Sequence, residues 1–388
     1  MTKVLQVVCA MYPRIGGIEQ VARDVARALK SSPDIEQKII CFNEDAETGG
    51  YVCHRKETIK DMVDGIEVTR CGCIAKVASQ QISLTYPRQL GKLLKSFDPD
   101  IVIFHYPNPY LAAFLLPKLK KHTKLVIYWH LDITKQKILG KLFHPQTLAL
   151  IKRADKIVGA TPMHINQSAH TKYFGDKKAL LPYTIDQKSL VMTEDEIQKA
   201  NEIKEKYNSK TIGLFVGRHV PYKGLKYLIE ASKELGEDKF KFLIAGTGPL
   251  TEELKKQAEG DEKIEFLGRI SSSERKQYLY ACDIVCFPSI TRNEGFGLAL
   301  AEGMYFGKPA VTFTIPGSGV NYVNLDGVTG IECPNGDSRA YAEALKKLAA
   351  DPELREKYGK AARQRVLEDF TEDIFEKNLM KLIGELDG

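Results

Sequence analysis

The chain has 388 residues, of which 43% are hydrophobic and 27% are charged, and its net charge is +6 at pH 7. This length and composition are typical of a soluble globular protein with two domains of ordinary size. No apolar run reaches the roughly 18–20 residues that a membrane-spanning helix needs, so no such segment is expected.

The cysteines and the N-terminal residues favour a cytosolic protein. The eight cysteines lack the spacing of zinc ligands, so we expect reduced and mostly buried thiols. The apolar run 4–10 is too short for a signal peptide and is predicted to be the first strand.

The charge is unevenly distributed. Residues 1–186 hold 27 Lys and Arg against 17 Asp and Glu, whereas the remainder holds 29 against 33. Within residues 117–153 one acid, Asp132, stands among nine basic residues: Lys118, Lys120, Lys121, Lys124, Lys135, Lys137, Lys141, Lys152 and Arg153. Such a patch suits a membrane surface, a phosphorylated substrate or simply a solvated helix face. Nucleic acid is disfavoured, because no nucleic-acid-binding module accompanies the patch.

In the first half, apolar runs typical of strands alternate with segments of helical periodicity. Strands are expected at residues 4–10, 37–42, 66–70, 101–104, 124–129, 156–158 and 179–181, and helices at 20–30, 87–96, 109–121, 138–152 and 163–173. Residues 182–196 are polar without strong periodicity and are predicted to connect two domains.

The second half repeats the alternation. Strands are expected at residues 211–216, 241–245, 264–267, 284–287 and 310–313, and helices at 196–207, 225–235, 250–258, 273–280, 338–350, 352–370 and 373–386. The predicted fold class is therefore α/β, with two doubly wound, Rossmann-like parallel-sheet domains facing across a cleft. Ligands are expected at the carboxyl ends of both sheets.

Residues 291–309 read T-R-N-E-G-F-G-L-A-L-A-E-G-M-Y-F-G-K-P and hold two carboxylates eight residues apart, Glu294 and Glu302. A strand, a Gly-Phe-Gly turn and a helix are predicted, with Gly297 at the helix start. A helix N-terminus beside a glycine turn can bind phosphate. Because Glu294 precedes the helix, the two acids are expected to reach different parts of one ligand. An ordinary surface loop with solvated acids is the alternative.

Other polar groups follow predicted strands. Gly16-Gly17 lies between a strand and a helix, and either lets a ligand approach the backbone or forms a plain turn. The loop is not a G-x-G-x-x-G fingerprint, which disfavours a nicotinamide cofactor. Arg218 and Lys223 follow the strand 211–216 and could clamp a diphosphate without a metal. Residues 98–100, D-P-D, are expected at the opposite sheet edge, as a polar turn and not a metal site.

Two acids, two cations and the histidines 105 and 130 around a diphosphate fit group transfer from a nucleotide-activated donor. The departing diphosphate gains charge as the bond breaks, and fixed cations stabilise it most at that moment. No metal and no cofactor is expected, since the nucleotide-activated donor is a substrate.

Several motifs together resemble glycosyltransferase family 4, which comprises retaining sugar transferases of the GT-B fold. They are P-R-I-G-G-I-E, H-L-D, V-G-R-H-V-P-Y-K-G, A-G-T-G-P-L and E-G-F-G-L-A-L-A-E-G. The resemblance covers nearly the whole chain, and Y-W-H-L-D-I-T-K-Q-K and G-S-G-V-N-Y-V-N-L-D-G-V-T-G are similar to bacterial surface-polysaccharide mannosyltransferases. It implies an acceptor domain over 1–185, a nucleotide-sugar domain over 186–370, and a helix over 371–388 that returns to the first domain.

The resemblance also implies residue roles. Catalysis would involve Glu294 at the donor hexose, with His130 and Asp132 near the reacting centre. Many relatives have Gly or Ser where Leu131 stands, which leaves the role of Asp132 open. Donor binding would involve Gly16, Gly17, Arg218, Lys223, Gly246, Arg269, Ile270, Gly295, Phe296, Gly297, Leu298 and Glu302. Of these, Glu302 would hold the ribose, Arg218 and Lys223 the diphosphate, and Arg269 and Ile270 would lie beside the base.

The implied reaction moves a hexose, with mannose from GDP-mannose favoured, to a saccharide acceptor that is commonly lipid-linked. The implied location is the cytoplasm, with a peripheral contact to the inner face of the membrane through residues 117–153. A UDP-sugar donor with another acceptor, a sugar-nucleotide epimerase of the same fold and an inactive nucleotide-binding protein remain as alternatives. A dehydrogenase and a pyridoxal phosphorylase are disfavoured.

Overall fold

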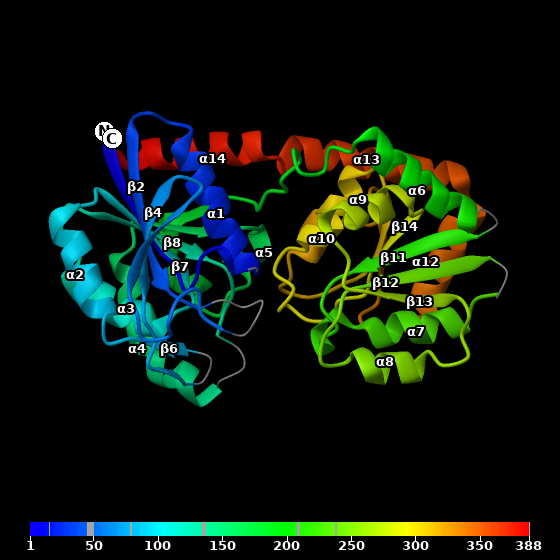
Figure 1. Ribbon diagram of the computed structural model, residues 1–388, viewed down its shortest axis with the longest axis horizontal. Coiled ribbons are helices and arrows are strands. Elements are labelled where there is room, and N and C mark those ends of the chain that lie inside the picture. The colour runs from blue at the N-terminus through cyan, green and yellow to red at the C-terminus, as the bar shows by residue number, and fades with distance from the viewer. Residues whose placement is uncertain are drawn as a thin grey trace. The chain divides into compact units, whose positions relative to one another are not determined.

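The computed structural model describes residues 1–14, 16–44, 50–77, 80–133, 137–207, 210–236 and 239–387. The chain forms two compact units (Figure 1). The first unit comprises Met1–Thr184 together with Glu372–Gly388, and the second comprises Ile185–Thr371.

The first unit contains an eight-stranded sheet in the order β10-β9-β8-β7-β1-β2-β4-β3. Its strands are β1 (Thr2–Val7), β2 (Ile35–Phe42), β3 (Ile59–Val63), β4 (Ile66–Cys71), β7 (Ile101–Tyr106), β8 (Lys124–Trp129), β9 (Lys156–Gly159) and β10 (Lys178–Leu180). All neighbours are parallel except β3 and β4, which are antiparallel. The hairpin of β5 (Ala75–Val77) and β6 (Gln80–Ile82) forms a separate small sheet.

The helices of the first unit are α1 (Gly17–Lys30), α2 (Tyr86–Ser96), α3 (Pro109–Leu115), α4 (Lys137–Arg153), α5 (Pro162–Asn166) and α14 (Glu372–Asp387). The C-terminal α14 packs against α1 (Figure 1). Ser31 after α1 donates a hydrogen bond of 2.7 Å to Glu376, and Lys156 forms an ion pair of 2.9 Å with Glu385. The last helix therefore belongs to the first unit.

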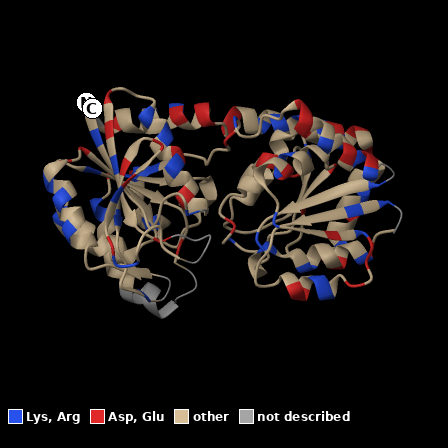
Figure 2. Ribbon diagram, viewed as in Figure 1, with Lys and Arg blue, Asp and Glu red and all other residues tan. Residues whose placement is uncertain are grey.

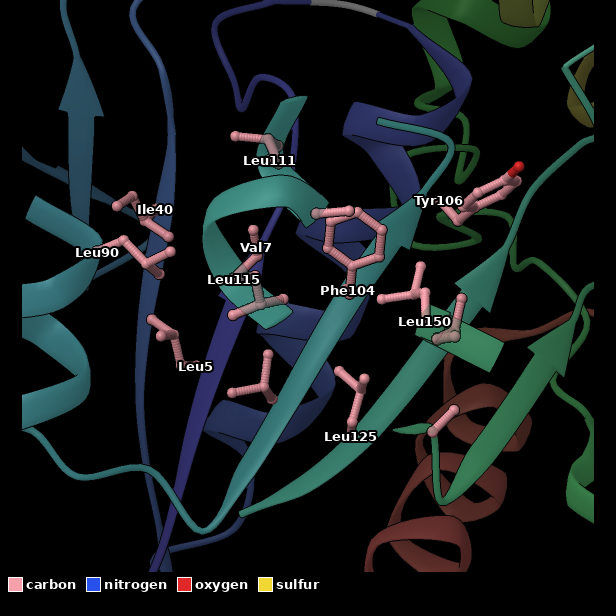
Figure 3. Packing of buried hydrophobic residues seen from close by; sticks show 14 of the residues in the cluster. Leu5, Val7, Ile40, Leu90, Phe104, Tyr106, Leu111, Leu115, Leu125 and Leu150 are labelled. Carbon is pink, nitrogen blue, oxygen red and sulfur yellow. The ribbon is translucent and has the colours of Figure 1, made fainter. Parts of the chain in front are cut away.

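The main core of the first unit lies between the sheet and helices α2, α3 and α4. Leu5 and Val7 of β1 and Phe104 of β7 lie in one layer with Leu90 of α2 and Leu111 of α3 (Figure 3). These strands are buried on both faces, which explains their continuous apolar sequence. Burial of each large apolar side chain contributes about 1.5–3 kcal/mol, so this layer holds the strand ends in place.

The second unit contains a six-stranded parallel sheet in the order β13-β12-β11-β14-β15-β16. Its strands are β11 (Thr211–Val216), β12 (Phe240–Ala245), β13 (Ile264–Gly268), β14 (Ile284–Phe287), β15 (Ala310–Phe313) and β16 (Gly330–Cys333). Its helices are α6 (Glu194–Lys206), α7 (Leu225–Lys233), α8 (Thr251–Gln257), α9 (Ser272–Ala281), α10 (Leu298–Tyr305), α11 (Val320–Val323), α12 (Ser338–Ala350) and α13 (Pro352–Asp369), and a short 3-10 turn, η4, spans Pro221–Lys223.

In both sheets the order of strand addition reverses beside the first strand. In the first unit the chain adds strands outward from β1 on one side and returns to add β7 on the other; in the second, β11 and β14 stand in the same relation. Ligands of doubly wound folds bind at such switch points, outside the carboxyl ends of the strands.

The predicted class of two doubly wound parallel-sheet domains is confirmed. Some elements differ from expectation. The helix predicted at 109–121 ends at Leu115, followed by a 3-10 turn to Lys118, and the one predicted at 163–173 is the short α5 followed by 3-10 turns. The antiparallel β3, the hairpin β5–β6 and the edge strand β16 were not predicted. No helix among the described residues is long and apolar enough to cross a membrane.

Candidate active site

The predicted donor-binding segments of the second unit all follow strands of one sheet. Arg218 comes after β11, Gly246 directly after β12, and Arg269 and Ile270 after β13, while Glu294 lies in the loop after β14. Because these strands are parallel, the segments emerge at the same edge of the sheet (Figure 1).

Glycines let the loops after β11 and β12 pack together. Gly246 has a φ of +120°, and a Cβ atom there would lie 1.9 Å from the Gly217 carbonyl oxygen. A Cβ at Gly248 would lie 2.4 Å from the carbonyl oxygen of His219. The described contacts therefore give Gly246 a packing role; its predicted donor contact stays a prediction.

An ion pair at the switch point joins a predicted phosphate ligand to a predicted hexose ligand. Lys223 Nζ, in η4, pairs with Glu294 Oε2, and both side chains are only 11% exposed. Ser289 Oγ donates a 3.1 Å hydrogen bond to the same carboxylate oxygen, and the Lys223 ammonium lies 4.8 Å from the centre of the Phe287 ring. Arg218 is exposed and makes no ion pair within the described part of the chain. Of the two cations that follow β11, Lys223 is thus paired with Glu294, and Arg218 is exposed.

The turn after Glu294 is anchored from elsewhere in the second unit. Ser318 Oγ donates to the Glu294 carbonyl oxygen, and the Gly319 amide donates to the Gly295 carbonyl oxygen at 2.9 Å. Phe296 is buried against the ring of Phe370, at 5.1 Å between centroids. Gly297, at a φ of +93°, caps α10, which begins at Leu298. Phe296 is therefore an anchor of the turn.

Glu302 lies on α10 and meets a partner that the sequence analysis missed. Arg275 Nη1, on α9, lies 3.1 Å from Glu302 Oε1. Burial raises the pKa of Glu302, and the Arg275 charge opposes this rise. Glu302 Oε2 and Arg275 Nε are both buried without a hydrogen-bond partner among the described residues. The sequence holds one signal for this contact, which is that Arg275 lies one turn into a helix that follows a predicted strand.

In the first unit, the start of α1 already holds a carboxylate. Gly16, the N-cap of the helix, is so close to Glu19 that a Cβ would lie 2.3 Å from Glu19 Oε2. Arg14 Nε lies 2.8 Å from the other Glu19 oxygen. Gly17 is the first helical residue, and the space beside it is open. An anionic ligand at this helix start would therefore have to compete with Glu19.

His130, directly after β8, is buried in a chain of hydrogen-bonded side chains. Its Nε2 lies 3.0 Å from Nδ1 of His105, and its Nδ1 contacts the Tyr183 hydroxyl. Nε2 of His105 lies 3.0 Å from Gln6 Oε1. Burial lowers the pKa of His130 well below its ordinary value and that of His105 to about 3. Both imidazoles are therefore neutral at pH 7.

Asp132 anchors the backbone segment that follows His130 to residues 168–169. Its Oδ1 accepts hydrogen bonds from Trp129 Nε1 at 3.1 Å and Ser168 Oγ at 2.7 Å, and its Oδ2 accepts from the Ala169 amide at 2.9 Å. Burial would raise the pKa of Asp132, but His170 and these donors lower it to about 2. Asp132 is thus a positioning group.

The predicted residues therefore form two groups, one in each unit. Lys223, Glu294 and the turn 295–298 are brought together in the second, and His130 and Asp132 follow one strand of the first. Within the described ranges, no three His, Cys, Asp or Glu side chains are gathered as metal ligands would be.

Two solved structures share this fold over nearly the whole chain. Sucrose-phosphate synthase (tll1590) from Thermosynechococcus elongatus superposes with a TM-score of 0.75 at 17% identity, covering 100% of this chain and 99% of its own. Anabaena Alr3699/HepE, solved in complex with UDP, superposes with a TM-score of 0.77 at 15% identity, covering 99% and 100%. The fold is the GT-B fold of glycosyltransferases.

The sequence comparisons agree. Residues 196–365 match the family described as glycosyl transferases group 1, and residues 15–178 match glycosyltransferase family 4. The O-antigen chain mannosyltransferase C of Escherichia coli is 30% identical over 96% of this chain and 95% of its own length. The D-rhamnosyltransferase WbpZ of Pseudomonas aeruginosa is 30% identical over 92% and 89%. The chain belongs to glycosyltransferase family 4, which confirms the resemblance predicted from its motifs.

Replacing Asp132 should weaken the first unit in a pH-dependent way. The folded-state pKa of about 2 lies below the ordinary 3.8, so the carboxylate stabilises the fold above about pH 4 and loses this effect as the pH falls towards 2. Asp132→Asn should lower the unfolding free energy at pH 7 by about 2 kcal/mol, a difference that shrinks below pH 4. Denaturant unfolding between pH 2 and 7 measures it. The exposed Asp176→Asn is the control, and an equal loss at every pH would contradict the assignment.

Proposed function

We propose that this glycosyltransferase moves mannose from GDP-mannose to a lipid-linked saccharide acceptor in surface-polysaccharide synthesis.

 The observation that carries this proposal is the joint placement of Lys223, Glu294 and Arg218 at the switch point of the second unit, in a chain that is 30% identical to an O-antigen mannosyltransferase over 96% of its length. The reaction would retain the configuration of the sugar and need no metal.

The chemistry follows from the charges at this point. Arg218 and Lys223 would bind the diphosphate and stabilise the charge that it gains as it leaves. The acceptor hydroxyl oxygen would form the new bond to the sugar carbon on the face from which the diphosphate departs, and a diphosphate oxygen would take the hydroxyl proton. Glu294 would contact hexose hydroxyls and form no covalent intermediate.

Glu302 and the start of α10 would serve the rest of the donor. The buried, unbonded Oε2 of Glu302 is suited to accept a hydrogen bond from a ribose hydroxyl. The first amides of α10, which begins at Leu298 directly after the Gly-Phe-Gly turn, would face the phosphates. Arg269 and Ile270, after β13, would flank the base.

A UDP-sugar is the second candidate donor. The structure of Anabaena Alr3699/HepE, whose fold this chain shares, holds UDP, and another holds UDP-glucose. The relatives at 30% identity that transfer mannose or D-rhamnose favour a mannose-type donor instead.

A thermal-shift screen of nucleoside diphosphates and their sugars tests the donor. A ligand that binds the folded state at about 100 times its Kd adds roughly 2.7 kcal/mol of stability. GDP and GDP-mannose should raise the Tm clearly more than UDP and UDP-glucose at equal concentration. Equal or greater stabilisation by the uridine ligands would assign the donor to the second candidate.

Replacing Glu294 by Gln separates binding from transfer. The change removes the carboxylate that pairs with Lys223, so the lysine becomes available to phosphate and GDP binding should be kept or strengthened. Release of GDP from GDP-mannose should fall at least about 100-fold, the usual scale for a lost group that stabilises the transition state. Calorimetry and product chromatography measure the two effects. Unchanged turnover by Glu294→Gln would rule out its assigned role.

We also propose a peripheral contact between residues 117–153 and the anionic inner face of the cell membrane. In support, Lys118 and Lys121 are exposed and unpaired within the described part of the chain, and Figure 2 shows basic residues on the neighbouring α2. Lys120 is paired with Asp98, and Arg153 with Asp155, which lowers the free charge of the patch. Lys135 lies outside the described residues.

Vesicle binding tests the membrane contact. Lys118→Glu with Lys121→Glu should weaken binding to vesicles that contain anionic lipid by about 30-fold or more, since each basic residue near such a surface contributes about 1 kcal/mol. The control pair, Lys226→Glu with Lys233→Glu in α7, makes the same charge change on exposed residues of the second unit. Equal binding by the two double variants would exclude this surface.

A further inference from the structure

Four buried side chains of the first unit form one hydrogen-bonded chain, and each of the four comes from a different strand or from the loop after it. Gln6 lies in β1, His105 in β7, His130 just after β8, and Tyr183 beyond β10. The three links are Gln6 to His105, His105 to His130, and His130 to Tyr183. The exposed fractions of the four residues are 0%, 2%, 2% and 7%.

The protons of this chain can be assigned by counting. Each neutral imidazole has one N–H, so it donates one hydrogen bond and accepts one. Gln6 Oε1 only accepts, so His105 donates from Nε2 and accepts at Nδ1. His130 then donates from Nε2 and accepts at Nδ1, which leaves Tyr183 as the donor of the last bond. Both ring nitrogens of His130 are used inside the protein.

The His130 ring is also held on a face, because the Tyr128 ring lies over it with the ring centroids 4.6 Å apart. The His105 ring is nearly coplanar with it, at 9° and 5.2 Å between centroids, as their hydrogen bond requires. The Tyr128 hydroxyl donates to the Leu181 carbonyl oxygen at 2.6 Å, so this neighbour is fixed as well. The backbone amide of His130 extends the sheet by donating to the Tyr106 carbonyl oxygen at 3.2 Å. The two hydrogen bonds therefore fix the plane of the His130 ring, and Tyr128 covers it on a face.

We propose that Tyr183 and His105 are positioning residues, which hold His130 as a neutral, doubly bonded imidazole that fixes the turn 130–132 and transfers no proton in the reaction. This inference rests on the proposed function for its kinetic consequences, but the bonding pattern can be tested without turnover. With Asp132 anchored on residues 168–170, the turn is fixed at both ends. A sugar or acceptor at this strand end would thus meet a preorganised backbone.

Nitrogen NMR of histidine-labelled protein tests the bonding pattern directly. We expect His130 and His105 each to carry a proton on Nε2 and none on Nδ1 at pH 7, with assignments from His130→Gln and His105→Gln. In Tyr183→Phe, the Nδ1 signal of His130 should move towards that of a nitrogen without a hydrogen bond. A charged His130, or a proton on its Nδ1, would overturn the proposal, whether or not the chain transfers mannose.

Kinetics then test the positioning role with a matched pair of variants. Tyr183→Phe and Tyr128→Phe each remove one buried hydroxyl that is hydrogen-bonded inside the first unit, so their effects on the Tm should be similar.

 Only Tyr183→Phe frees a nitrogen of His130, and it should lower kcat for release of nucleoside diphosphate from the most stabilising nucleotide sugar about tenfold, with KM unchanged.

His130→Gln separates positioning from proton transfer. Loss of a general acid or base typically lowers the rate about 10²–10⁴-fold, whereas loss of a positioning group should lower kcat by about tenfold, as in Tyr183→Phe. A loss of 100-fold or more in His130→Gln, or equal kcat values for Tyr183→Phe and Tyr128→Phe, would refute the proposal. Absence of transfer in the wild-type protein, with the NMR pattern as expected, would refute the proposed function alone.

Discussion

The parallel direction of the strands is the constraint on which the rest of the molecule depends. A parallel strand can be followed by another only through a crossover, so every strand of a sheet ends at the same edge and every loop after a strand begins there. In the second unit this brings the loops after β11, β12, β13 and β14 to one edge, although β11 ends at Val216 and β14 at Phe287, 71 residues later. The buried apolar layers of both sheets fix the positions at which these loops begin. The residues of the loops supply the chemical groups of the site.

Much of this could be predicted from the sequence, because alternating strand and helix patterns determine a doubly wound fold and the glycine motifs mark the loops that follow strands. The contacts between loops could not. The pairing of Lys223 with Glu294 joins residues 71 positions apart through loop conformations that no periodicity encodes. Arg275 sits in a helix whose sequence looks like an ordinary solvated face, and only the fold shows that it meets Glu302. The anchoring of Asp132 depends on residues 168–170, which were predicted to be one continuous helix but form turns.

Three of the predicted charged groups, Lys223, Glu294 and Glu302, are paired inside the protein, Lys223 with Glu294 and Glu302 with Arg275. At the start of α1, Glu19 is likewise paired with Arg14. Partly buried charges need such partners, because an unpaired charge loses its hydration without compensation. Binding of a donor is then an exchange of partners, and its free energy is the difference between the new contacts and the old ones.

This exchange bears on which ligand the second unit prefers under the proposed function. A nucleoside diphosphate can draw Lys223 towards its phosphates, but the Glu294 carboxylate, at 11% exposure, then retains just the Ser289 hydroxyl as a side-chain donor among the described residues. A complete nucleotide sugar supplies phosphate oxygens to the lysine and hydroxyl donors to the carboxylate, so both halves of the broken pair are satisfied at once. A neutral sugar alone offers nothing that replaces the carboxylate beside Lys223. The ion pair therefore favours the intact donor over either of its fragments, which is the selectivity that a transferase needs before the bond is broken.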